Sequence, residues 1–174
     1  ADTINKDPRV NEKLKVVYLE DYRVTVAEEL MPAAEISEQI SLAGTEASGT
    51  SNMKFMINGA VTLGTLDGAN VEIHEAVGDE NILLFGMTTP EVQNLKHSGY
   101  HPQVYYNNNP VLKAAIDELR AGFCGVRFED IANSLLNSDP YMLLADYADY
   151  EKIQRRAAEI YQDQKAWNRM SLCN

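Results

Sequence analysis

The sequence lacks most features that mark secreted, membrane or metal-binding proteins. It has only two cysteines, Cys124 and Cys173, at a separation that fits no metal-ligand motif, so we expect free thiols in a reducing cytoplasm and no metal site. No apolar run approaches the length of a membrane span, and we expect none. The first residues lack the basic and then apolar pattern of a signal peptide. No internal repeat or low-complexity segment is present.

Positive charge is also scarce. The 174 residues carry 15 Lys and Arg against 26 Asp and Glu, a net charge of −11. This balance argues against nucleic acid or an anionic membrane as the main partner. Any phosphate site must therefore be locally positive. The apolar fraction of 45% and the length suit a globular chain with one sizeable core.

The first half of the chain predicts strands that alternate with helices. Short apolar runs predict strands at 14–19, 36–42, 60–63 and 81–85. Helical spacing and turn residues predict helices at 24–31, from 50–52 to 57, and at 69–77. This alternation predicts an α/β fold with a parallel sheet, whose functional loops follow the carboxyl ends of the strands. Tyr22, the loop 46–54 and Gly64–Asp67 all fall at such positions.

The second half predicts helices, with breaks at the asparagine run 107–109 and at 137–140. The predicted helices are Pro90–Lys96, Pro110–Ala121, Phe128–Asn137 and Asp149–Met170. We therefore divide the chain into a βα part at 1–87 and a mainly helical part at 88–174. The tyrosines of the second half lack a common spacing, so we favour helical packing over an aromatic platform for sugars.

The stretch from Gly44 to Phe55 carries the strongest chemical signal. Gly44 and Gly49 permit a close approach of the backbone to a ligand, and a helix starts among Thr50, Ser51 and Asn52 with its free N–H groups available to an anion. The glycine spacing is a near miss to a nucleotide phosphate loop, because Thr50 stands where that loop needs lysine. An ordinary connection with a snorkelling Lys54 remains the alternative at this level.

The residues themselves add a family resemblance. Glu46-Ala-Ser-Gly-Thr-Ser-Asn-Met-Lys54, followed by Asn58-Gly-Ala60 and Gly64-Thr-Leu-Asp-Gly-Ala-Asn-Val-Glu72, closely resembles the pyridoxal-phosphate region of the α-glucan phosphorylases. The match extends from about residue 10 to 90 and continues, more weakly, to the end. It implies a fragment of the second Rossmann-like domain of a GT-B fold, with a parallel sheet followed by a helical segment.

The resemblance also implies roles for individual residues. Lys54 matches the lysine that forms the Schiff base with pyridoxal phosphate, and an apolar setting among Met53, Phe55 and Met56 would favour its neutral amine. The matches to cofactor-binding positions are Tyr22, Arg23, Val24, Gly49, Thr50 and Ser51, where Ser51 replaces the usual glycine. The matches to positions contacting glucosyl hydroxyls are Glu46, Ala47, Ser48 and Gly49.

The implied activity is reversible phosphorolysis of α-1,4-glucans to glucose 1-phosphate in a cytoplasmic, full-length homodimer. The upstream basic cluster that binds substrate phosphate in the family has no counterpart near Lys6 and Arg9. We therefore expect no complete set of catalytic residues, no activity and weak or absent cofactor attachment in the isolated chain. Two alternatives stay open: a different GT-B enzyme that uses a nucleotide sugar, and a glucan-binding module with a vestigial site.

Overall fold

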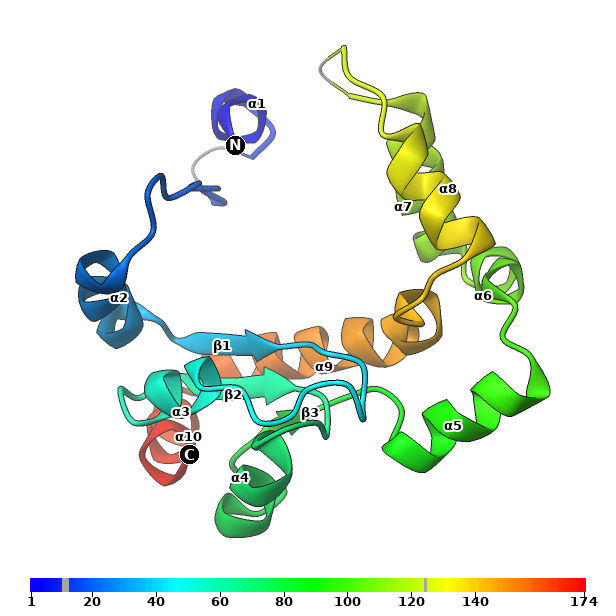
Figure 1. Cartoon of the computed structure of the whole chain (residues 1–174). Helices are drawn as coiled ribbons and strands as arrows, with labels where there is room; N and C mark the ends of the chain where they lie inside the picture. Colours follow the sequence, from blue (N-terminus) through cyan, green and yellow to red (C-terminus); the bar gives the residue numbers. More distant parts are fainter. Residues whose placement is uncertain (11–12, 124) are drawn as a thin grey trace.

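The computed structural model describes residues 1–10, 13–123 and 125–174 (Figure 1). Its strands form one parallel sheet in the order β1-β2-β3, and their bounds are β1 (Ile36–Gln39), β2 (Val61–Gly64) and β3 (Leu83–Leu84). Ile36 pairs with Val61, and Leu63 pairs with Leu83. The α/β class and the parallel sheet predicted from the sequence are thus confirmed. The sequential order is that of one half of a doubly wound sheet.

Helices make up most of the remaining regular structure. In the first half they are α1 (Asp2–Lys6), α2 (Val24–Leu30), the 3-10 helix η1 (Met31–Ala33), α3 (Ser51–Met56) and α4 (Asn70–Val77). In the second half they are α5 (Thr89–Ser98), α6 (Pro102–Asn108), α7 (Pro110–Ala121), α8 (Glu129–Asn137), α9 (Leu143–Gln162) and α10 (Gln164–Cys173). Within the described residues, no helix is both long and apolar enough to cross a membrane.

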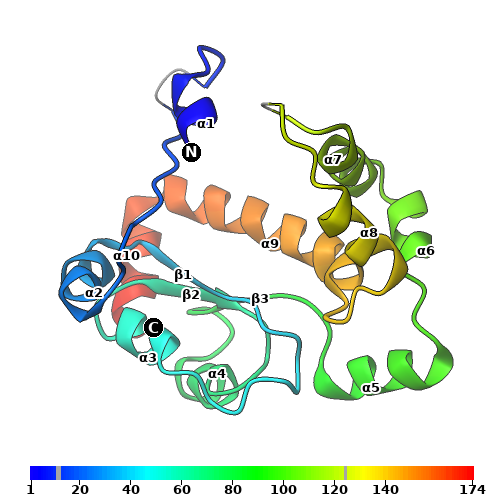
Figure 2. The ribbon, with the colours of Figure 1, turned by 45° about the horizontal axis from the view of Figure 1, so that its top comes forward.

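Two helical layers cover the sheet. Figure 2 shows α9 on one side of the strands and α3 and α4, which connect the strands, on the other. The main core forms where Val61 and Leu63 of β2 and Leu83 of β3 meet residues of the last two helices, Ala157, Trp167 and Met170. The α9 and α10 helices therefore belong to the same packed unit as the sheet.

Two further apolar clusters extend this core. Leu112 and Ile116 of α7 pack against Leu136 of α8 and Leu144 of α9, and Tyr105, Tyr106 and Tyr147 lie around them. The packing role predicted for these tyrosines is thus confirmed. A third cluster joins Leu42 and Ala43, just before the glycine-rich loop, to Val92 and Met142. The loop is therefore anchored at its start to the helical half.

The strand predicted at 14–19 is wrong for this structure. The segment runs as extended coil outside the sheet, with Leu14, Val17 and Tyr18 exposed. The Asn5 side-chain amide closes two hydrogen bonds with the Val16 backbone, at 2.7 and 2.8 Å. The described sheet consists of β1, β2 and β3, and none of these strands lies beside the 14–19 segment. An apolar run without a neighbouring strand cannot form a ladder.

Other differences are shifts of element boundaries. β1 and β3 are shorter than predicted, whereas β2 keeps its predicted length and lies one residue later, ending at Gly64. The single helix predicted at 149–170 starts six residues earlier and divides at Asp163, whose carboxylate accepts hydrogen bonds from Lys165 N and Ala166 N. The predicted break at 107–109 is confined to Asn109, which caps α7 through Val111 N and Leu112 N, while α6 occupies the two preceding asparagines.

Candidate cofactor and sugar site

The candidate site lies at the carboxyl end of the sheet, as the strand polarity predicts. The loop between β1 and α3 contains Gly44 and Gly49, whose φ angles of 86° and 77° lie in the left-handed region that glycine tolerates. Thr50 occupies the N-cap position of α3. The Ser51 hydroxyl at the start of α3 donates a hydrogen bond of 3.1 Å to Gln39 Oε1 at the end of β1. The helix start is therefore tied to the edge where the strands end.

Lys54 lies one turn into α3, on the same face as Ser51 because the two are three residues apart. Its side chain is exposed, and it enters no ion pair within the described part of the chain. Met53 and Ile57 beside it are also exposed, while Phe55 and Met56 are half-buried. The expected enclosure of Lys54 among apolar side chains is thus wrong for this structure, because these side chains do not close over the amine.

A buried carboxylate holds the loop in place. Asp67, in the turn after β2, accepts hydrogen bonds from Gly44 N at 2.8 Å, Ser41 Oγ at 2.8 Å and Glu46 N at 2.9 Å. Burial alone would raise the pKa of Asp67, but the hydrogen bonds from Glu46, Ser41 and Gly44 outweigh burial and hold the pKa below its usual value. The charged form is therefore the one that fits the loop.

A pair of buried amides joins the same turn to α3. Asn52 Nδ2 donates to Asn70 Oδ1 at 2.9 Å, and Asn70 Nδ2 donates to Thr65 O at 3.0 Å. Asn52 Oδ1 accepts from Met53 N at 2.9 Å. The start of α3 and the start of α4 are thus fixed relative to one another.

Sequence reasoning missed these supporting residues. It placed Gly64–Asp67 at the functional edge of the sheet and Asn52 among the residues where a helix starts, without a role for the Asp67 and Asn52 side chains in holding the site. The sequence did contain a signal for these residues, because Asp67 and Asn52 lie in the segments that follow two strands predicted to be parallel. The partner of Asp67 was not visible, because the groups that it binds lie 21 to 26 residues earlier in the chain.

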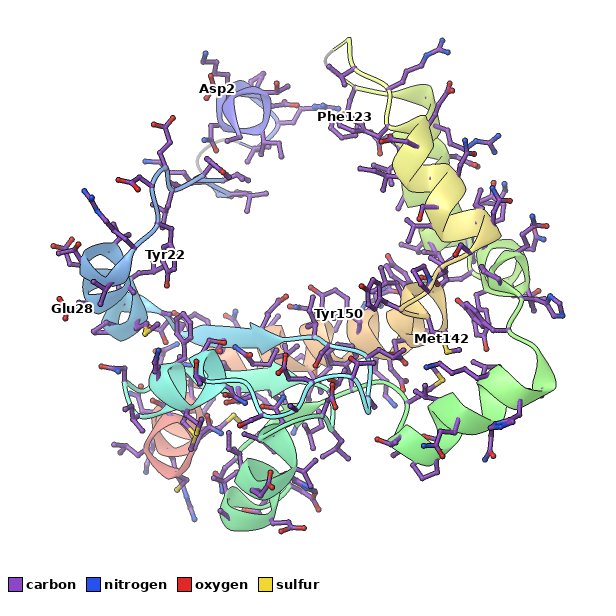
Figure 3. All side chains as sticks on the ribbon, in the orientation of Figure 1. Asp2, Tyr22, Glu28, Phe123, Met142 and Tyr150 are labelled. Carbon is purple, nitrogen blue, oxygen red and sulfur yellow. The ribbon has the colours of Figure 1, made fainter. Side chains whose placement is uncertain are left out.

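The structure brings together only part of the predicted site. The residues 46–51 and Lys54 share one loop and helix start beside the Asp67 turn. Tyr22, Arg23 and Val24 lie at the start of α2, toward the amino end of β1 (Figure 3). Tyr22 and Val24 are exposed, and Arg23 pairs with its neighbour Asp21 at 3.3 Å. These three predicted cofactor contacts are therefore separate from the other site residues in this structure.

A cavity of about 380 Å³ adjoins the loop. Ala47 and Ser48 line it together with Met53 and Met56 of α3 and Glu72 of α4. A larger cavity of about 720 Å³ lies beside α9 and the end of β3. Several charged groups that line it are already paired along α9, as in the Glu151–Arg155 and Arg156–Glu159 ion pairs. The smaller cavity is the one beside the candidate site.

The helix start suits the implied cofactor in part. An exposed lysine amine is accessible to an aldehyde, and the Thr50 hydroxyl beside a helix N-terminus is a donor suited to a phosphate group. The Ser51 hydroxyl would serve the same purpose only by giving up its hydrogen bond to Gln39 Oε1. The donors expected from Tyr22 and Arg23 do not reach this group of residues. Gly49–Lys54 therefore fits pyridoxal phosphate as a partial site. Cys173 is an exposed free thiol, as predicted, and Cys124 lies outside the described residues.

Comparison with known proteins gives one consistent family. The model of the carbohydrate phosphorylase family matches residues 1–174. The chain is 51% identical to a glycogen phosphorylase of Synechocystis sp., 49% identical to the muscle form of Ovis aries and 50% identical to the liver form of Homo sapiens. Each alignment covers 100% of this chain and 21% of the relative, so the chain spans about a fifth of their length. The chain belongs to the carbohydrate phosphorylase family.

Proposed function

We propose that a full-length protein containing this chain catalyses the reversible phosphorolysis of α-1,4-glucans to glucose 1-phosphate, with pyridoxal phosphate attached at Lys54. The observation that carries the proposal is the combination of the Glu46–Lys54 loop and helix start, at the carboxyl edge of the sheet, in a chain matched throughout by the phosphorylase family. The similar proteins are named glycogen phosphorylases, which favours this activity over a nucleotide-sugar enzyme.

The residues of this chain would have three separate roles: attaching the cofactor, binding its phosphate and binding the sugar. The Lys54 amine would hold the cofactor covalently, while the Gly49 backbone and the Thr50 and Ser51 hydroxyls would bind its phosphate. Glu46 would accept hydrogen bonds from glucosyl hydroxyls and so discriminate against sugars that lack them. When bound, the cofactor would supply through its 5′-phosphate a proton partner for the substrate phosphate, as the family resemblance implies.

Other parts of the proposal rest on the resemblance. They are the GT-B arrangement with a facing domain, roles for Tyr22, Arg23 and Val24 in binding the cofactor, a full-length homodimer, and a cytoplasmic location. Because Tyr22 is exposed and distant from the Glu46 loop here, its proposed role requires the 14–24 segment to move toward the cofactor. The proposed catalytic centre also needs cationic groups for the substrate phosphate, because positioning and electrostatics carry this kind of chemistry.

Lys54 can be tested directly in a protein of the relatives' length that contains this sequence. Borohydride reduction and peptide mapping should place the cofactor label on Lys54, and Lys54→Ala should lose both the label and the activity. Lys54→Arg is the matched control, because it keeps the positive charge but cannot attach the aldehyde, and it should behave like Lys54→Ala. A label on Lys15 or on another lysine would overturn the assignment.

The isolated chain gives a second test. A helix N-terminus contributes about 0.3–1 kcal/mol to anion binding near a surface, which is less than a single charge-assisted hydrogen bond of about 1.5–3 kcal/mol. We therefore expect weak cofactor attachment to the 174-residue chain and no release of glucose 1-phosphate from maltodextrin and phosphate. A stoichiometric Lys54 adduct that survives dialysis would contradict the weak attachment, and turnover above the buffer rate would contradict the inactivity.

A further inference from the structure

The turn between β2 and α4 contacts the loop of Glu46 at several points. Thr65, 1% exposed, donates its hydroxyl to Ser41 O at 2.6 Å, and the Asp67 carboxylate belongs to a residue only 5% exposed. Its two oxygens accept from two backbone N–H groups, of Gly44 and Glu46, and from the Ser41 hydroxyl. One of these donors is the amide of Glu46 itself. The position of the Glu46 backbone is therefore set by Asp67.

The next residues of the turn hold the far side of the same loop. Ala69 N donates to Ser48 O at 2.7 Å. A Cβ atom at Gly68 would lie 2.5 Å from Ser48 O and 3.0 Å from Glu46 Cγ. The turn thus lies against the loop so closely that only glycine fits at that position. Residues 46 and 48, which match positions contacting the sugar, both touch the turn.

The start of the loop is fixed from the opposite direction. Leu42 and Ala43 are buried in the cluster with Val92 and Met142. The Asp67 carboxylate therefore binds the loop just after its packed start, where the following residues become exposed. Within the described residues the Glu46 side chain forms no ion pair, so its carboxylate depends on the backbone for its position.

We propose that Asp67 is a positioning residue that fixes the backbone of Glu46 and so sets where the Glu46 carboxylate meets a glucosyl hydroxyl. This inference rests on the proposed function for its sugar, whereas the contacts that carry it belong to this chain. A carboxylate is required because all three partners donate, and a carboxylate accepts at both oxygens. An asparagine in its place would turn an N–H₂ group toward at least one of these donors.

The first experiment uses the 174-residue chain and measures amide hydrogen exchange by NMR. Asp67→Asn should speed exchange at Gly44 and Glu46 by about tenfold, since each of these amides loses its acceptor or its geometry. The matched control is Asp139→Asn. Asp139 is also buried, at 1% exposed, and also accepts three hydrogen bonds, from Leu143 N, Leu144 N and Tyr100 Oη. Asp139→Asn should leave the exchange rates of the Gly44 and Glu46 amides unchanged, apart from any increase that all slowly exchanging amides share through global unfolding.

A milder variant keeps the test usable if Asp67→Asn does not fold. Ser41→Ala removes one of the three donors and leaves the carboxylate and both backbone contacts in place. It should speed exchange at the same two amides by about two- to threefold. Unchanged exchange at Gly44 and Glu46 in Asp67→Asn, or in Ser41→Ala where the first variant is unfolded, overturns the holding role of Asp67.

The second experiment uses a full-length protein containing this chain. Asp67→Asn should raise KM for glucose 1-phosphate about tenfold, with a smaller change in kcat and unchanged cofactor content. If Asp67 acts through Glu46, this KM effect should nearly vanish in a Glu46→Ala background. The positioning role would be refuted if the KM effect of Asp67→Asn persisted in the Glu46→Ala background. It would also be refuted if Asp139→Asn raised KM equally, because Asp67 would then only stabilise the fold.

The two experiments separate the inference from the proposed function. If the unsubstituted full-length protein shows no phosphorolysis, the proposed function fails, and the exchange measurement still decides whether Asp67 holds the loop. If phosphorolysis is present and KM is unchanged in Asp67→Asn, the proposed function stands and the positioning role of Asp67 is refuted.

Discussion

Trp167 is the residue whose loss should disturb the fold most. It is the single tryptophan of the chain and is 1% exposed, between β2 and β3 and the last helices. Its ring packs against Tyr161 with the ring centroids 5.1 Å apart and the planes at 81°. Its Nε1 donates to Glu35 Oε2 at 2.9 Å, just before β1. This side chain thus joins α10 to the sheet through both packing and a hydrogen bond.

We predict that Trp167→Ala lowers the free energy of unfolding by about 3–5 kcal/mol, the usual cost of removing a large aromatic from a core. The hydrogen bond adds little to this, because Glu35 is exposed and water replaces the lost donor. Small domains have a total stability of about 5–15 kcal/mol, so the variant should be close to unfolding at room temperature. The cost is therefore dominated by the cavity.

Urea unfolding followed by far-ultraviolet circular dichroism suits this test, because the variant has no tryptophan to observe. Leu172→Ala is the matched control on the same helix: Leu172 is 89% exposed, and its truncation should cost less than about 0.5 kcal/mol. Trp167→Phe should cost less than Trp167→Ala, since a phenyl ring refills part of the space. A loss below about 1 kcal/mol in Trp167→Ala would refute the packing of α10 against the sheet.

Two further predictions concern backbone strain and a buried carboxylate. Gly68→Ala should lower the free energy of unfolding by about 2–4 kcal/mol, because Gly68 has a φ of 53° and its added Cβ would lie 2.5 Å from Ser48 O. Gly78→Ala is the control: Gly78 has a φ of 77° but nothing within 4 Å of its Cβ, so the loss should be only about 1 kcal/mol. Equal losses of stability in chemical unfolding would contradict the close contact at Gly68. Burial raises the pKa of Asp146 above its ordinary value, against a hydrogen bond from Met87 N and with Asp149, Asp139 and Glu91 nearby. Stability from the protonated form of Asp146 is present below the unfolded pKa of about 3.9 and is lost as pH rises through the folded pKa. Asp146→Asn should therefore stabilise the chain near pH 7 and lose that gain near pH 3, and a difference that stays constant between pH 3 and 7 would refute the shift.

Local signals in the sequence were sufficient for several helices. The α7 helix runs from Pro110 to Ala121 as predicted, because proline suits the first turn and Gly122, at φ 82°, ends the helix. The start of α3 was also predictable, since Thr50, Ser51 and Asn52 are residue types typical of helix starts, although the Thr50 side chain makes no capping hydrogen bond here. In both cases the boundary is set by residues within one turn of it.

Features that depend on distant residues were not predictable in the same way. The run at 14–19 has strand composition, yet no strand lies beside it and it remains outside the sheet. The acidic side chain of Asp67 was visible in the sequence, but its partners became apparent only when β1 and β2 were paired in register. Asp163 is a good N-cap residue, but the apolar residues on both sides of it keep a helical spacing, and the sequence therefore predicted one helix where the structure has α9 and α10. Register and neighbouring strands, rather than residue type, decide these features.

The packing also bears on the proposed division of the chain at residue 88. Val61, Leu63 and Leu83 come from the first part, but the buried surface facing them is supplied by Ala157, Trp167 and Met170 of the second. Hydrogen bonds cross the same boundary, from Trp167 to Glu35 and from Thr62 N to Asn174 Oδ1 at 3.0 Å. A sheet this small exposes its apolar face unless α9 and α10 cover it. The strands that carry the candidate site therefore depend on the last helices of the chain for their stability, although those helices contribute no predicted site residue.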